Sequence, residues 1–524
     1  MRHFEEFIDG ETSTAPVFTD KSRLHEAADI IQKLQLTAQE LPSSGFSEAK
    51  RRIDAKYSDV ESALIEEFVK SHRSNDKQRM KDLANILSGF KSYNACVDAF
   101  IEQQVQLKAH PSAPSKRGIG NELFQETVPL CQRSWQVIES VFPNPHQVMA
   151  KLVLNIYHSR LKEHIDTKLS EKSPEHYLSN LYQLYSATSR LTSELGQFNL
   201  GSDHLFLSNL TKTIFRGYLD NYINIECRFL NERCTLILQR YYEKKGHQKK
   251  ALTALQGIKR DLQGIIASKA NVNIETVSYG GETFLSSEEV AINILQLTKE
   301  AFRRCQALSS SKDLAGHAVE IFGILVSYLL HEHVDYALEI GLYGIPLPEC
   351  KTIPELFFFD VVGQTNAIIH LVEKQFSDSL LPLVASTPKH ADCLAKKKNE
   401  LEVLERKIDA GVDRSLNALV GWVKTVLTTE QRKSDFNPPI PSKGMAAAPP
   451  TTSTTACNRV VKFVNYQVER IRESLDGKNI EFLLYELGVR LHRTIYDHMQ
   501  QFTYSSEGVF AIMCDVQVRD IQAG

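Results

Sequence analysis

The sequence has little net charge, and neither sign of charge is in clear excess. Its 524 residues include 61 Lys and Arg against 64 Asp and Glu, which gives a formal net charge of −3 at pH 7. No global positive field therefore draws the chain to nucleic acid or to anionic lipid, and any such binding has to be local. Apolar residues make up 42% of the chain, which is typical of a folded protein rather than a disordered one.

Paired cysteines are missing as well. The nine cysteines are widely spaced, and no Cys-x-x-Cys occurs. An odd number at such spacing argues against a disulfide framework and against a structural zinc site. We therefore expect most of them to be small buried hydrophobes in a reducing compartment.

Long apolar runs are also absent. The longest, Ile321–Leu330, is far shorter than the ~20 residues that span a bilayer, so it predicts a buried core helix. The first residues, Met1–Glu6, are charged and show no signal peptide, so any membrane role is expected to be peripheral. Because the chain begins without a natural start of structure, we also expect upstream sequence to be missing.

Enzyme signatures are absent from the sequence. There is no Gly-x-x-x-x-Gly-Lys-Ser/Thr loop, no Gly-x-Gly-x-x-Gly after a strand and no Gly-x-Ser-x-Gly elbow. His331 and His333 flank Glu332, but residues i and i+2 of a helix point about 200° apart, whereas zinc proteases need i and i+4. This trio predicts a solvated helix face, and His492 and His498 fail the same test. We expect no catalytic, cofactor or metal site, and no enzyme.

Helical periodicity dominates what is present and predicts an all-α fold. A long segment, Asp203–Tyr242, carries one unbroken apolar stripe and no proline. As a single helix it would be roughly 50–60 Å long at 1.5 Å per residue. The sequence therefore predicts an elongated rod of consecutive antiparallel helical bundles. The spacing i, i+3, i+4 is clearest in an early stripe of Leu24, Ala27, Ile31, Leu34 and Ala38.

Loops and prolines divide this pattern. A segment with alternating apolar residues, Asn271–Ser286, fits either a short hairpin or a loop, and the loop is favoured because no neighbouring strands exist. The proline-rich Gln431–Thr455 is expected to be a linker that packs neither as helix nor as core. The predicted units are bundle A at 1–140, bundle B at 141–270, bundle C at 271–430, the linker at 431–455 and bundle D at 456–524.

One basic cluster surrounds a turn that the sequence predicts at Gly246. It fits either contact with anionic lipid headgroups or an acidic partner, or simply a solvated helix–helix turn, and the solvated turn is favoured. A second run, Lys396–Lys398, includes no aromatics and fits a solvated face, so no nucleic-acid binding is expected. The candidate anionic contact patch consists of Arg240, Lys244, Lys245, Lys249 and Lys250.

Three consecutive aromatics, Phe357–Phe359, form the third unusual feature. They cover about 200° of a helix, so at least one of them must face a second packed surface. That arrangement fits either a helix buried between two bundles or a helix covered by a partner.

Three short segments of the sequence resemble a known family. These stretches, Phe357–Asn366, Arg228–Cys234 and Gly421–Lys424, look like the exocyst component five family of tethering-complex subunits. The resemblance covers nearly the whole chain and carries no catalytic residues. It implies a non-catalytic subunit, built of helical bundles, of the complex that tethers secretory vesicles to the plasma membrane before fusion.

The same resemblance implies partners and a location. Other exocyst subunits are the expected partners, chiefly component six, with Arf-type or Rab-type GTPases bound directly or through the partner subunit. The complex is expected to be cytoplasmic and recruited to plasma membrane sites of exocytosis. Family members also carry an N-terminal coiled coil, which this chain is expected to lack. An alternative that stays open is a peripheral lipid-binding scaffold acting through the basic cluster.

Overall fold

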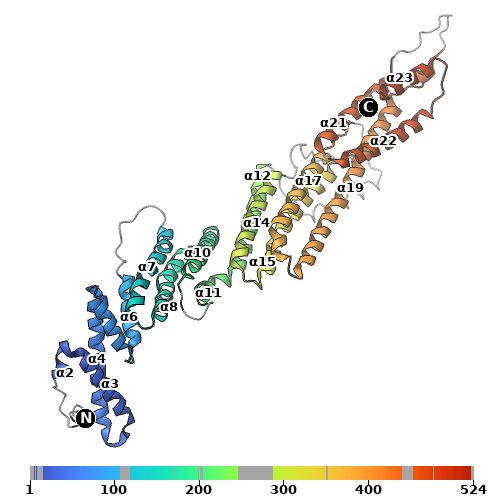
Figure 1. Ribbon diagram of the computed structural model, residues 1–524. Coiled ribbons are helices and arrows are strands. Elements are labelled where there is room, and N and C mark those ends of the chain that lie inside the picture. Colours follow the sequence, from blue (N-terminus) through green and yellow to red (C-terminus); the bar gives the residue numbers. More distant parts are fainter. Residues whose placement is uncertain are drawn as a thin grey trace. The chain divides into compact units, whose positions relative to one another are not determined.

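The computed structural model describes residues 16–106, 119–245, 287–439 and 452–520, apart from 172, 199, 201–204, 350–351 and 476 within these ranges, together with 5, 7 and 8. Every element in these ranges is a helix, which confirms the predicted all-α class (Figure 1). Its backbone forms two compact units, 1–222 and 223–524. The four-bundle division and the rod shape stay predictions, and the segment Asn271–Ser286 lies outside the described residues.

The N-terminal unit packs successive helices against their neighbours. The long helix α4 lies against α3, α5 and α6, and α7 lies against α5, α8 and α10. The helices of this unit are α2 Pro16–Thr19, η1 Lys21–Arg23, α3 Leu24–Glu40, α4 Ser43–Arg73, α5 Lys77–Leu87, α6 Tyr93–Gln106, α7 Ile119–Val141, α8 Pro145–Ile156, η2 Tyr157–Leu161, α9 Lys162–Leu169, α10 Pro174–Leu195 and α11 Phe206–Leu219.

The C-terminal unit has one continuous apolar core, which runs from Leu230 to Leu487 in sequence. The core is built on α19, a helix of 42 residues that contacts α15, α16, α17, α21 and α22. The helices of this unit are α12 Tyr222–Lys244, α14 Glu288–Leu308, α15 Leu314–Leu325, η3 Val326–Asp335, α16 Tyr336–Tyr343, α17 Phe358–Gln375, η4 Phe376–Leu380, α18 Leu381–Val384, α19 Lys389–Glu430, α20 Lys433–Phe436, α21 Thr455–Ser474, α22 Lys478–Met499 and α23 Gly508–Asp520.

The prediction of a single helix over Asp203–Tyr242 is wrong. The chain leaves the helix at Asp220 and Asn221, so α11 ends at Leu219 and α12 begins at Tyr222. Asp and Asn side chains compete with the backbone for hydrogen bonds and are weak helix formers. The apolar stripe continues across the break because each of the two helices buries one face.

The apolar run Ile321–Leu330 is buried, as predicted. It belongs to the helical stretch Leu314–Tyr343, which is long and apolar enough to cross a membrane by length and composition alone. Within the run, Ile321, Phe322 and Leu329 are at most 1% exposed and belong to the core of the C-terminal unit. Its apolar character is therefore accounted for by protein packing.

The aromatic run Phe357–Phe359 faces more than one packed surface, which confirms that prediction. The Phe358 ring is buried so closely that a Cβ built on Gly411 of α19 would lie 2.0 Å from it. On another side, the guanidinium of Arg470 on α21 lies 5.5 Å from the Phe357 ring centroid. The run therefore joins α17 to both α19 and α21.

The start of the predicted linker is ordered, contrary to the expectation that it packs neither as helix nor as core. Lys433–Phe436 forms the single turn α20, and Phe436 is only 3% exposed. Its ring packs edge-on against Phe502 with 5.2 Å between centroids. A buried aromatic therefore anchors this end of the segment to the C-terminal unit, whereas residues 440–451 lie outside the described ranges.

Most of the described cysteines are buried, as predicted. They are all free thiols, and only Cys227 and Cys514 among them are half-buried. Burial raises the pKa of Cys96 and of Cys131 to about 12. A thiol with such a pKa is protonated and unreactive at neutral pH, which fits a packing role.

Candidate functional site

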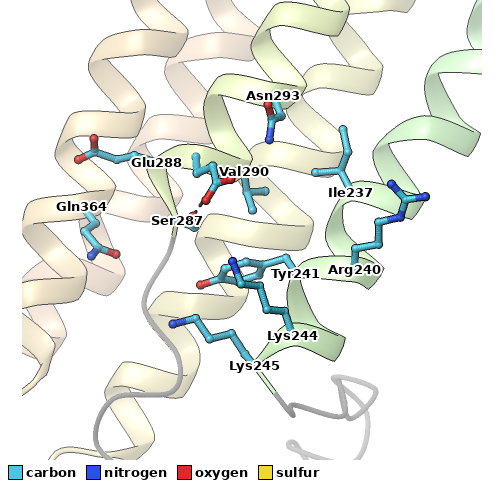
Figure 2. A pocket seen from close by; sticks show the side chains of 11 residues that line it. Ile237, Arg240, Tyr241, Lys244, Lys245, Ser287, Glu288, Val290, Asn293 and Gln364 are labelled. Atoms are coloured by element: carbon cyan, nitrogen blue, oxygen red, sulfur yellow. Dashed lines mark hydrogen bonds between the residues drawn. The ribbon is translucent and has the colours of Figure 1, made fainter.

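The basic cluster lies beside a pocket at the end of α12 and the beginning of α14. The pocket is open and has a volume of about 560 Å³. Figure 2 shows Lys244 and Lys245 extending from the last turn of α12 into it, while Asn293 and Ser287 border it from α14 and its cap. Gln364 of α17 contributes a further wall.

Three of the five predicted patch residues line this pocket. They are Arg240, Lys244 and Lys245, and all three are exposed. The other two, Lys249 and Lys250, lie outside the described residues. The structure therefore brings part of the predicted patch together at one end of a helix.

Acidic side chains line the same pocket, which sequence reasoning did not foresee. Glu288 and Glu289 lie in the first turn of α14, where carboxylates are favoured by the helix dipole. Two carboxylates opposite three cations leave only a small positive excess. An incoming phosphate would therefore meet repulsion as well as attraction at this pocket.

The helix cap that shapes the pocket depends on His333. Ser287 caps α14 with its side chain, which accepts from the Val290 N–H at 3.4 Å. The Ser287 backbone N–H donates to Nε2 of His333 at 2.9 Å, and the His333 ring lies edge-on to Tyr241. His333 is fully buried, so the predicted solvated face is wrong for this residue.

The two histidines of the His331–His333 trio point to different partners. Nε2 of His331 lies 3.1 Å from a carboxylate oxygen of Glu400 on α19, whereas His333 faces the cap of α14. Nothing in the sequence near His333 marks its contact with Ser287, which is 46 residues away. Within the described ranges, no group of three or more His, Cys, Asp or Glu is placed to hold a metal ion.

The tyrosines next to the pocket are neutral hydroxyls. Burial raises the pKa of Tyr241 above its ordinary value, and burial raises that of Tyr242 further. The Tyr242 hydroxyl donates to the Glu332 carbonyl oxygen at 3.1 Å. These rings therefore support the wall of the pocket and tie α12 to η3.

Comparison with known proteins assigns the chain to a family. The model described as exocyst complex component Sec10-like, alpha-helical bundle, matches residues 26–518. The chain belongs to this family. Curated relatives agree with the assignment: exocyst complex component 5 of Homo sapiens is 45% identical over 98% of this chain and 71% of its own length.

More distant relatives carry the same name. Exocyst complex component 5 of Drosophila melanogaster is 44% identical over 95% of this chain and 68% of its own, and that of Caenorhabditis elegans is 40% identical over 98% and 76%. A solved structure of S. cerevisiae Exo70 covers 98% of this chain and 97% of its own, with 10% identity and a TM-score of 0.38, which is too low to carry an argument.

Two of the three stretches that resemble the family contain close packing sites in this structure. A Cβ on Gly363 of α17 would lie 2.0 Å from the Ser474 carbonyl oxygen, and one on Gly421 of α19 would lie 2.1 Å from that of Pro348. Only glycine permits such backbone approaches. In these two stretches, the resemblance to the family therefore coincides with close packing of the backbone.

Proposed function

We propose that the chain is a non-catalytic subunit of an exocyst complex, which tethers secretory vesicles to the plasma membrane before fusion. The identity of 45% over 98% of the chain with a curated exocyst component carries this proposal. The helical units support it, since buried aromatic anchors and long helices make rigid bodies that present partner surfaces.

The proposed partners are the other exocyst subunits, chiefly component six. Arf-type or Rab-type GTPases act on the chain directly or through that partner. The proposed location is a cytoplasmic complex that is recruited to plasma membrane sites of exocytosis. Purification of the protein from cells tests this proposal, because a stoichiometric subunit brings the rest of its complex with it. Absence of component six alone from the purified complex would contradict its assignment as the chief partner.

A second candidate function is direct contact with an anionic membrane through the basic cluster. The exposure of Arg240, Lys244 and Lys245 at one end of α12 favours it. The carboxylates of Glu288 and Glu289 in the same pocket oppose it. Exposed lysines near a charged surface contribute about 1 kcal/mol each at most, so two opposing carboxylates offset most of the attraction.

Liposome flotation separates the two functions. The double variant Lys244→Glu/Lys245→Glu is expected to float with phosphatidylserine vesicles to the same small extent as the unchanged chain. A matched control is Lys396→Glu/Lys398→Glu, which changes the charge equally at two exposed lysines of α19. A clear loss of flotation for the first variant and not for the control would instead support the lipid-binding function.

A further inference from the structure

An apolar groove lies between α21 and α22, far in sequence from the basic pocket. Its volume is about 690 Å³. Figure 1 shows α21, α22 and α23 as the last helices of the C-terminal unit. Most of the lining is aliphatic: α21 contributes Val460, Val461, Val464 and Val468, α22 contributes Leu484, Leu487, Leu491 and Ile495, and α23 contributes Val516.

An exposed stripe on α22 borders this groove. Its side chains recur at alternating spacings of three and four residues, which is the seam that one helix presents to another in a coiled coil. Large apolar side chains in such a stripe are normally covered, yet Phe482 is 73% exposed and Tyr485 is 71% exposed. The stripe consists of Phe482, Tyr485, Val489, His492 and Tyr496.

A glycine lies in the middle of the groove. Gly488 is in the interior of α22, where glycine weakens a helix relative to alanine. Among the residues that the structure describes, no contact with a neighbouring element requires it, because none of their atoms lies within 4 Å of a Cβ built there. Its missing side chain leaves the backbone of α22 open to close approach from outside.

The charge of the groove is of one sign. Among the described lining residues, Arg472 on α21 is the one that carries a full charge and none is acidic, while His492 adds an imidazole ring. Arg472 meets Glu469 on its own helix at 3.2 Å, but both side chains are more than half exposed. Such a surface pair is weak, so the guanidinium is available to a carboxylate from outside.

We propose that this groove binds one amphipathic α-helix of a partner protein. The apolar stripe of that helix packs between Val464 and Leu491, its backbone approaches Gly488, and an Asp or Glu on its edge pairs with Arg472. A helix fits because the 3–4 spacing matches a helical seam and the groove follows two helices. The proposal rests on the proposed function, since it gives the chemistry of one partner of an assembly subunit.

Two designed helical peptides test the groove directly. Both have leucine at the a and d positions of their heptads, and one carries Glu and the other Lys at the flanking positions. In fluorescence anisotropy with the full chain, the Glu peptide is expected to bind at least about tenfold more tightly than the Lys peptide, because like charges oppose the second. The variant Arg472→Glu is expected to reverse this preference.

A bulky side chain at the glycine gives the sharpest variant. The Cβ of a side chain at Gly488 meets no described atom within 4 Å, so Gly488→Trp is expected to place its indole in the groove and to weaken binding of the Glu peptide about tenfold or more. The matched control is Gly217→Trp, since Gly217 is another exposed helical glycine with nothing within 4 Å of its Cβ. This control is expected to bind the peptide as the unchanged chain does.

Three results would overturn the proposal. They are failure of the Glu peptide to bind, binding that Gly488→Trp leaves unchanged, and dimerisation of the chain that Gly488→Trp abolishes, which would make a second copy the occupant. The peptides contain no exocyst sequence, so their failure would leave the proposed function standing. Failure of the proposed function would instead appear as missing exocyst subunits in the purified complex.

Discussion

Replacement of Arg304 by methionine is expected to destabilise the C-terminal unit by about 3–5 kcal/mol. The guanidinium donates to both carboxylate oxygens of Glu226, at 2.8 and 2.7 Å. The Glu226 side chain is 0% exposed and that of Arg304 is 13% exposed. Without Arg304, the Glu226 carboxylate on α12 would stay buried opposite α14 with no counterion. Removal of one partner of a buried ion pair destabilises a protein far more than replacement of both partners does.

The two tryptophans of the chain make this measurable, since Trp135 lies in the N-terminal unit and Trp422 in the C-terminal unit. Urea unfolding followed by fluorescence in a Trp135→Phe background reports on the C-terminal unit alone, which avoids a two-state treatment of the whole chain. The double variant Glu226→Gln/Arg304→Met is the control and should recover most of the lost stability. A single variant within about 0.5 kcal/mol of the parent would contradict a structural role for the pair.

Replacement of Trp422 by alanine is expected to cost about 3–5 kcal/mol, as for other fully buried large aromatics. Trp422 is 2% exposed, and its ring centroid lies 4.1 Å from that of Phe463 on α21. The guanidinium of Arg459 lies 5.7 Å from the same ring. Loss of the indole therefore leaves a cavity between α19 and α21 and removes a cation–π contact.

Native-state hydrogen exchange of backbone amides in α19 and α21 measures this effect, because the substitution removes the fluorophore and circular dichroism would sum the two units. Trp422→Phe keeps most of the apolar volume and is expected to cost less than Trp422→Ala. Tyr466→Ala, at a side chain of α21 that is 58% exposed, is the surface control and should stay within about 0.5 kcal/mol of the parent. Equal stability of the two alanine variants would show that Trp422 does not hold α19 to α21.

Apolar periodicity was sufficient to predict the helices but not where they end. The stripe from Leu24 to Ala38 correctly predicts the helix α3, because one face of that helix is buried. The same reasoning fails at Asp220 and Asn221, where two helices share an uninterrupted stripe. A two-residue break leaves the apolar pattern intact, so only the weak helix propensity of these residues marks it.

The candidate site was only partly predictable for a similar reason. Charge clustering along α12 correctly places Arg240, Lys244 and Lys245 at one helix end. Glu288 and His333 reach the same region through tertiary packing of α14 and η3. Contacts between residues so far apart in sequence leave no local pattern, and they place carboxylates beside the basic cluster, whose contact with an anion stays a prediction.

The most direct test of the central claim is quantitative mass spectrometry of the complex that is purified with this protein from cells under native conditions. An exocyst subunit is expected to bring down the other exocyst subunits at equal molar amounts, component six among them. In the same experiment, the Arg472→Glu variant alters the proposed groove, whereas the Gly217→Trp variant leaves the groove unchanged and serves as the control. Recovery of the chain alone, or with partners that include no exocyst subunit, would contradict the account.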